Sequence, residues 1–240
     1  MRVSIIIPAY NEENYIEGAL QALNKYKPND IEIIVVNNGS TDKTVKKVSN
    51  FPNVKLIHEN RRGVQFARER GRLEARGRII ANLDADCIPG ENWIKSALKY
   101  LEDERVIAVS GPYEYHDGNL FFRITSFLTQ KIFYNQASKF FYFLFGRGVV
   151  TMGGNIFIRA EALQAIGGYD TRISFYGDDT DTGNRLVVLG KVLYKNDLVV
   201  KSSARRFKNR GLVQTFWKYL INYFWVIIFK EPYHKKSLGE

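Results

Sequence analysis

The sequence predicts an α/β protein built on a mostly parallel, doubly wound central sheet. Over the first 110 residues, short apolar runs of strand length alternate with helical patterns, and this alternation is typical of parallel sheets with helices on both faces. The apolar runs are nearly continuous, as expected for strands that are buried on both sides. With 240 residues, of which 45% are hydrophobic, the chain can bury one sizeable core.

The elements of the first half follow one another regularly. Apolar runs predict four strands, at Val3–Pro8, Ile31–Val36, Val54–His58 and Arg78–Leu83. Apolar residues recur at the spacing of one helical face after the first strand, at Ile16, Ala19, Leu20 and Leu23. The turn Gly39-Ser40-Thr41-Asp42 caps the helix after the second strand. Val64–Ala75 is expected to form a basic helix before the fourth strand.

The second half is less regular. We expect helices at Glu91–Leu101 and Asp179–Leu189, and strands at Val106–Ser110 and Asn155–Arg159. Between them, Leu120–Phe145 is dense in aromatic residues. Most of this stretch is expected in the core, but an apolar acceptor groove or a contact with a bilayer are alternatives.

The tail, residues 205–240, is basic and aromatic. Its segment Leu212–Phe229 is largely apolar but includes Lys218 and Asn222, so its uninterrupted apolar part is shorter than the ~20 residues of a membrane span. Basic residues on both sides favour an amphipathic helix in the membrane interface; the alternative is a helix packed on the domain or in a dimer. We expect one catalytic domain over residues 1–204, with halves 1–110 and 111–204, followed by this tail.

The charge of the chain requires an acidic partner. The formal net charge is +10, and arginines gather between Arg61 and Arg78 and again in the tail. Nucleic acid, anionic membrane and phosphorylated substrates all fit such a charge. No segment matches a base-reading module, which disfavours nucleic acid. A single cysteine, Cys87, and no apparent signal peptide predict a cytoplasmic protein.

Asp84-Ala85-Asp86 is the most informative local pattern. It follows a buried strand and precedes Pro89-Gly90, so both carboxylates are expected at the carboxyl end of a strand, where open α/β sheets bind ligands. Strand alternation would point residues 84 and 86 the same way, and a divalent cation relieves the repulsion between two such acids. The pattern predicts a metal–diphosphate site; the alternative is a strand end with solvated acids.

Four stretches together resemble the family-2 glycosyltransferases. They are Ser4-Ile-Ile-Ile-Pro-Ala-Tyr-Asn-Glu-Glu13, Val35-Val-Asn-Asn-Gly-Ser-Thr-Asp42, Leu83-Asp-Ala-Asp86 and Tyr176-Gly-Asp-Asp-Thr-Asp181. The resemblance covers about the first 200 residues and implies a GT-A fold, which is Rossmann-like. It also implies inverting sugar transfer from a nucleotide-diphosphate donor with Mg²⁺ or Mn²⁺. Gly154, Asn155 and Asp178 then fall on the acceptor side.

The resemblance assigns a donor site to the first three stretches. Pro8, Ala9, Tyr10 and Glu12 would frame the base and ribose, although Pro8 also ends a strand and Glu12 also favours a helix start. Asn37 and Asn38 stand where many members have Asp. An amide can still accept from a base, but Asn is equally suited to forming a turn, so uridine is not singled out. Asp84 would contact the ribose or a metal-bound water, and Asp86 would ligate the metal.

The resemblance assigns catalysis to the fourth stretch. Asp179 takes the position of the general base that accepts the proton of the acceptor hydroxyl. Neighbouring acids would raise its pKa, and a helix N-terminus would lower it. The structural alternative is a run of acids that favours a helix start. Arg205 and Arg206 would contact the diphosphate or an anionic acceptor, or else belong to a basic juxtamembrane cluster.

The sequence therefore predicts a non-processive glycosyltransferase on the inner face of a membrane. Gln214-Thr-Phe-Trp217 departs from the Gln-x-x-Arg-Trp motif of processive relatives. The donor would be of UDP or GDP type, and the acceptor a saccharide, a lipid-linked sugar or a polyprenyl phosphate. Two rival hypotheses are a catalytically silent assembly partner that keeps the nucleotide-sugar pocket, and a basic nucleic-acid-binding protein. An oligomer is compatible with all three.

Overall fold

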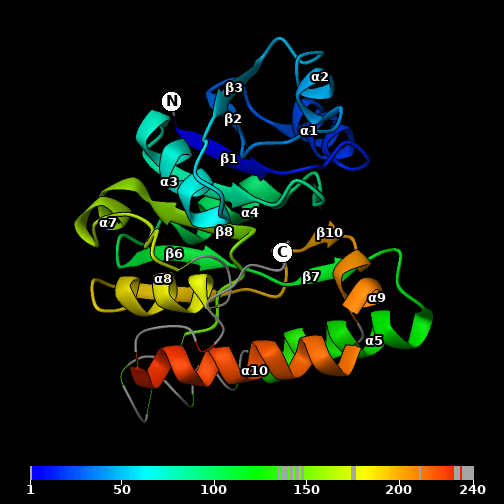
Figure 1. Cartoon of the computed structure of the whole chain (residues 1–240). Helices are drawn as coiled ribbons and strands as arrows, with labels where there is room; N and C mark the ends of the chain where they lie inside the picture. Colours follow the sequence, from blue (N-terminus) through cyan, green and yellow to red (C-terminus); the bar gives the residue numbers. More distant parts are fainter. Residues whose placement is uncertain are drawn as a thin grey trace.

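The computed structural model describes residues 2–134, 136, 140, 143, 146, 149–173, 177–210, 212–229 and 233. Tyr176 of the fourth motif, parts of the aromatic stretch 120–145 and most of the tail beyond Phe229 lie outside these ranges. Within them the predicted fold class is confirmed: a large, mostly parallel sheet is flanked by helices on both faces (Figure 1).

The sheet has seven strands in the order β3-β2-β1-β4-β8-β6-β9. Their bounds are β1 Val3–Ala9, β2 Ile31–Asn37, β3 Val54–His58, β4 Ile79–Leu83, β6 Val106–Ser110, β8 Asn155–Arg159 and β9 Lys191–Tyr194. β8 runs antiparallel to both of its neighbours, and the other pairs are parallel. Because Asn155 at the start of β8 pairs with Leu83 at the end of β4, both lie at the same edge as the carboxyl ends of β1 and β2.

Strand alternation divides the core into two layers. One layer joins Ile5 and Ile33 to α1 (Ile16–Tyr26) and α4 (Trp93–Tyr100). The other joins Ile6 and Ile34 to α3 (Val64–Glu74), α7 (Ala160–Ala165) and α8 (Asp178–Leu186). Helices thus cover both faces because successive strand residues point to opposite sides. The short helix α2 spans Thr44–Val48.

A second, small sheet lies beside the main one. It pairs β5 (Ile88–Pro89), β10 (Val200–Ser202) and β7 (Tyr113–Tyr115) in that order. Because β5 follows Asp86 and β10 precedes Arg205, this sheet brings the end of the domain next to the carboxylate turn after β4.

Three further helices lie in the lower part of Figure 1: α5 (Leu120–Leu128), α9 (Arg205–Arg210) and α10 (Leu212–Phe229), named among the described residues. The π-helical segment η1 (Thr129–Tyr134) follows α5 directly. Phe207 of α9 packs on Phe122 of α5, with ring centroids 5.0 Å apart, and α10 packs on α8. Within the described part of the chain, none of the helices combines the length and hydrophobicity that a membrane crossing requires.

Candidate active site

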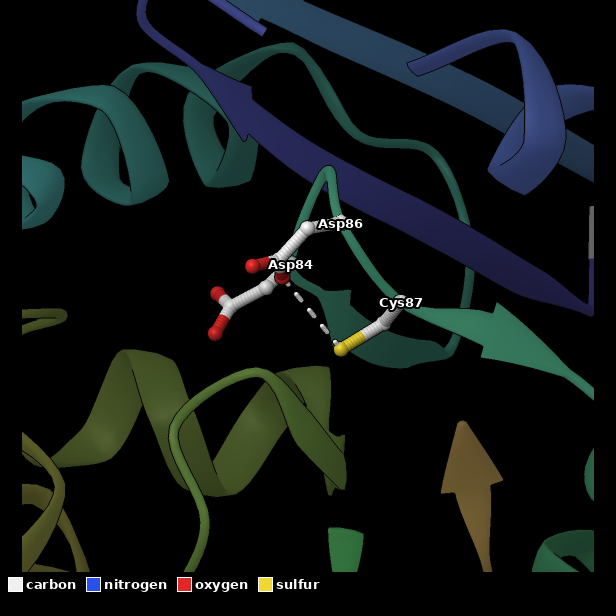
Figure 2. A group of neighbouring side chains, drawn as sticks. All are labelled: Asp84, Asp86 and Cys87. Carbon is white, nitrogen blue, oxygen red and sulfur yellow. Dashed lines mark hydrogen bonds between the residues drawn. The ribbon is translucent and has the colours of Figure 1, made fainter. Parts of the chain in front are cut away.

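The carboxylates of Asp84 and Asp86 converge after β4. Their ligand atoms and the Cys87 thiol lie within 4.8 Å of one another, and Figure 2 shows the thiol directed toward the two acids. The reason differs from the expected strand alternation: β4 ends at Leu83, and a turn closed by the Cys87 N–H donating to the Asp84 carbonyl (2.9 Å) folds the acids together. Asp84 and Asp86 thus lie at the carboxyl end of β4.

The chemistry of this cluster fits a hard cation. Two carboxylates supply the oxygen ligands that Mg²⁺ and Mn²⁺ prefer. Burial raises the pKa of the Asp86 carboxyl, Asp84 raises it further, and Arg205 and Arg206 oppose the rise. A cation would stabilise the ionised form of both acids. Burial also raises the pKa of the Cys87 thiol well above its ordinary value, and sulfur is a softer ligand than Mg²⁺ or Mn²⁺ prefers.

Arg205, at the start of α9, joins the first and third motifs. Its guanidinium donates to Glu12 Oε1, and its Nε lies 3.4 Å from Asp86 Oδ2. The ring of Tyr15 lies under the same guanidinium, 4.5 Å away. Burial raises the pKa of Glu12 to about 7 despite Arg205, with Asp86 and Asp84 adding to the shift. Arg206 is exposed and acts on Asp86 through its charge.

The ends of β1 and β2 form the neighbouring wall of the site. The Asn38 N–H donates to the Ala9 carbonyl (2.8 Å), and the Arg62 guanidinium stacks on the half-exposed Tyr10 ring at 3.6 Å. Asn37 accepts from the Ser40 N–H and contacts His58 Nδ1 at 3.1 Å. The Asn38 amide donates to the carbonyls of Glu59 and Arg61 and accepts from the Gly63 N–H.

These contacts show the two asparagines in the turn-forming role that was the alternative to base recognition. Both side chains are buried and hold the loop after β3. Base recognition by Asn37 and Asn38 therefore stays a prediction, and the exposed pair of Tyr10 and Arg62 lies beside them.

Arg68 of α3 was not singled out by the sequence. Its side chain is only 5% exposed, and it pairs with Asp178 Oδ2 at 2.6 Å and with Asp84 Oδ1 at 3.2 Å. Although Arg68 belongs to the arginine-rich segment 61–78, it does not face solvent, because it lies on the sheet-facing side of α3. The signal in the sequence was spacing: Arg68 follows Ala67 and precedes Gly71 by three positions, and these two small residues lie on the face of α3 that packs on β1 and β2.

Tyr113 is a second residue that the sequence did not reveal. Its hydroxyl donates to Asp84 Oδ2 (3.4 Å) and accepts from the Gly154 N–H (2.9 Å). Gly154 in turn lies so close to Asp84 that a Cβ there would be 2.0 Å from the carboxyl carbon. Asn155 is fully buried: its amide accepts from Trp93 Nε1 and donates to the carbonyls of Pro112 and Leu198.

Asp178 and Asp179 begin α8, directly after Gly177 in the left-handed conformation. Burial raises the pKa of Asp178, opposed by Arg68. Burial also raises the pKa of Asp179, and the nearby Asp178 raises it further, while the hydrogen bond from the Thr180 N–H works in the other direction. The side-chain environment thus outweighs the helix N-terminus, which by itself would lower both values.

The tail helix α10 closes the outer side of this acid pair. A Cβ on Gly177 would lie 2.4 Å from Val226 Cγ2, and Asn222, Val226 and Ile227 are buried. Tyr223 is close enough for the Asp179 charge to raise the pKa of its phenol, in addition to burial. The alternative of a tail helix packed on the domain is thus correct for one face of α10.

Comparison with known proteins identifies relatives of this chain. The family model of Glycosyl transferase family 2 matches residues 4–167. Glycosyltransferase AglE of Haloferax volcanii is 27% identical over 186 residues, which are 73% of this chain and 58% of AglE. Probable glycosyltransferase YdaM of Bacillus subtilis is 30% identical over 209 residues, 79% of this chain and 47% of YdaM. The chain spans about half the length of these relatives.

Solved structures show the same fold. A mannosyltransferase of Pyrobaculum calidifontis, PcManGT, in complex with GDP-Man and Mn²⁺, superposes with a TM-score of 0.72 at 25% identity, covering 95% of this chain and 64% of that one. Glucosyl-3-phosphoglycerate synthase of Mycobacterium tuberculosis, with Mn²⁺, UDP and phosphoglyceric acid, gives 0.66 at 18% identity, covering 94% and 78%.

Proposed function

The chain belongs to glycosyl transferase family 2, and from this membership we propose that it moves a hexose from a nucleotide-diphosphate donor to an acceptor, with inversion. The fold and family expected from the four motifs are confirmed. One observation carries the proposal: Arg68 contacts both Asp84 and Asp178, so the donor-side carboxylates and the acid pair of α8 border one site. Single-step inversion needs the donor and the base in such proximity.

We propose that Asp86, with Asp84 beside it, holds a Mg²⁺ or Mn²⁺ ion together with the donor diphosphate. The convergence of their oxygens within 4.8 Å supports this, as does the Mn²⁺ bound by PcManGT. When bound, such an ion would neutralise charge on the departing diphosphate. Arg205, which already contacts Asp86 and Glu12, is placed to donate to the same phosphates.

Asp179 is the proposed general base. A hydroxyl acceptor must lose its proton as its oxygen attacks the anomeric carbon while the bond to the diphosphate breaks. Its raised pKa, caused by burial and by Asp178, brings the carboxylate closer to the basicity that proton transfer near neutral pH requires. A polyprenyl phosphate acceptor is already anionic, so the reaction would then depend less on Asp179.

We further propose that the acceptor is presented at a membrane, to which α5 and α10 attach the enzyme. Both helices expose large apolar side chains at helical spacing, among them Phe121, Ile124 and Leu128 of α5 and Trp217, Ile221 and Phe224 of α10. No Asp or Glu occurs between Asp117 and Glu161 or between Asp197 and Glu231. Acid-free, basic and aromatic segments favour the surface of an anionic bilayer, such as the inner face of a cell membrane.

The test is calorimetric binding of UDP, GDP and dTDP, each with and without Mn²⁺. We expect one nucleotide to bind with metal and this binding to be lost in Asp86→Ala, but kept in Asp103→Ala, which alters a surface carboxylate paired with Arg105. No binding to folded wild-type protein would contradict the proposal. Metal-dependent binding without transfer to any of the sugar or lipid acceptors would instead indicate a silent assembly partner.

A further inference from the structure

Arg68 is a buried cation between two functional groups of the site. Its Nη1 donates to Asp178 Oδ2 at 2.6 Å, and its Nη2 donates to Asp84 Oδ1 at 3.2 Å. Its Nε has no partner among the described residues. One turn earlier on α3, Gln65 Nε2 lies 3.5 Å from the Asp178 carbonyl. Two side chains on the inner face of α3, Arg68 and Gln65, therefore contact the first residue of α8.

The charge balance shows that these pairs are interdependent. Burial would by itself lower the pKa of the Arg68 guanidinium, but Asp178 and Asp84 together raise it above the ordinary value. A buried charge that loses its partner is strongly unfavourable. Removing Arg68 would therefore leave Asp178 without its counter-charge, and we expect the beginning of α8 to move toward solvent.

The backbone before β8 lies directly against the Arg68 guanidinium and the Asp84 carboxylate. A Cβ on Gly153 would lie 2.9 Å from Arg68 Nη1, and one on Gly154 would overlap the Asp84 carboxylate. The two glycines allow the chain before β8 to pass directly over the Arg68–Asp84 pair. The guanidinium is thus enclosed between α3, α8 and this segment.

We propose that Arg68 is the positioning residue that fixes the first turn of α8, and with it Asp179, at a set distance from the donor-side carboxylate Asp84. The inference rests on the proposed function only for the roles of Asp84 and Asp179. Planar geometry is the essential property, because a guanidinium reaches two carboxylates with separate nitrogens, whereas an ammonium is a single point charge. Lysine at position 68 is expected to keep one pair and lose the other.

Hydrogen exchange tests this without requiring activity. We compare Arg68→Met and Arg68→Lys with Arg70→Met, which removes an arginine of the same helix that pairs with Glu74 on the surface. Amides of residues 177–182 should exchange at least about tenfold faster in Arg68→Met, by an intermediate factor in Arg68→Lys, and as in wild type in Arg70→Met. Unchanged exchange at α8, or faster exchange spread evenly over the domain, would overturn the proposal.

Kinetics supplies the functional readout. Because small misplacements of a reacting group cost on the order of 10²-fold, kcat should fall by about that factor in Arg68→Met, with a much smaller change in the donor KM. Adding Asp178→Asn should cause little further loss, since both substitutions release the same turn. Multiplicative losses would overturn the proposal. Failure of the wild type to transfer sugar would contradict the proposed function alone, because the exchange result does not depend on turnover.

Discussion

At Gly154 the absence of a side chain makes room for the Asp84 carboxylate. A Cβ at this position would lie 2.0 Å from the carboxyl carbon, and the Asp84 N–H donates to the Gly154 carbonyl at 3.2 Å. Gly154→Ala must therefore displace Asp84. We expect metal-dependent nucleotide binding, measured by calorimetry, to weaken by about tenfold or more. Gly90→Ala, where a Cβ meets nothing within 4 Å, is the matched control; equal effects would contradict this prediction.

Asn155 is expected to act on stability. Its amide satisfies the buried Trp93 Nε1 and the carbonyls of Pro112 and Leu198. Asn155→Ala removes this partner from Trp93 Nε1 and from the Leu198 carbonyl, whereas the Pro112 carbonyl still accepts from the Val200 N–H. We therefore expect the free energy of unfolding to fall by about 3 kcal/mol. Urea denaturation measures it, with the exposed Asn53→Ala as control. A loss no greater than that of the control would show that the amide is not needed for folding.

Asp179 should make the reaction rate fall at acidic pH, which appears as an acid limb in the pH profile of kcat. Because burial and Asp178 raise its pKa, the ionised fraction, and with it kcat for a hydroxyl acceptor, should rise with pH through a range above that of an ordinary carboxyl group. Asp179→Asn should lower kcat by about 10²-fold or more and abolish this limb. Near-normal turnover of the variant on a polyprenyl phosphate would remove the assignment of Asp179 as base for that acceptor.

At the scale of elements, α9 brings a competing cation to the site. Arg205 Nε lies 3.4 Å from Asp86 Oδ2, so a metal ion and the guanidinium attract the same carboxylate. Arg205→Gln should bind Mn²⁺ alone about tenfold more tightly and the nucleotide diphosphate less tightly. Titration followed by electron paramagnetic resonance measures the first effect. Lys201→Gln removes the same charge from an exposed position; unchanged or weaker metal binding in Arg205→Gln would contradict the prediction.

The sequence revealed the long elements and missed the contacts between them. Strands such as Val54–His58 and Asn155–Arg159 begin and end as their apolar runs predict. The small sheet could not be foreseen, because β5 and β10 have only 2 and 3 residues and pair across about half of the chain. The antiparallel direction of β8 is likewise invisible in a continuous apolar run.

The same distinction holds for the site. Asp84, Asp86 and Asp179 lie in motifs that can be recognised from the residues next to them in the sequence. Arg68 and Tyr113 gain their roles from partners far away in the sequence, Asp178 and Gly154 respectively. The places of Arg68 and Tyr113 in the site can be predicted only when the order of the strands in the sheet is known.

At the scale of the whole molecule, we expect the protein to bind to anionic membranes through α5 and α10. Phe121 and Trp217 are 77% and 54% exposed, and we expect Phe121→Asp and Trp217→Asp each to reduce sedimentation with anionic phosphatidylglycerol vesicles by about tenfold. Binding to these vesicles should decrease with salt and be weaker to neutral ones. Leu73→Asp, at an exposed apolar site on α3, is the control. Vesicle binding that is insensitive to both substitutions would contradict a role for α5 and α10.

The position of β8 between β4 and β6 has a consequence for synthesis on the ribosome. When Ser110 has been made, β4 and β6 exist but have no strand between them, and β8 begins only at Asn155. At about 5–20 residues per second, translation needs roughly 2–9 s to reach it. During this interval the edges of β4 and β6 that will pair with β8 are both unpaired in the nascent chain. We therefore expect the growing polypeptide to require chaperone protection until β8 has paired with β4 and β6.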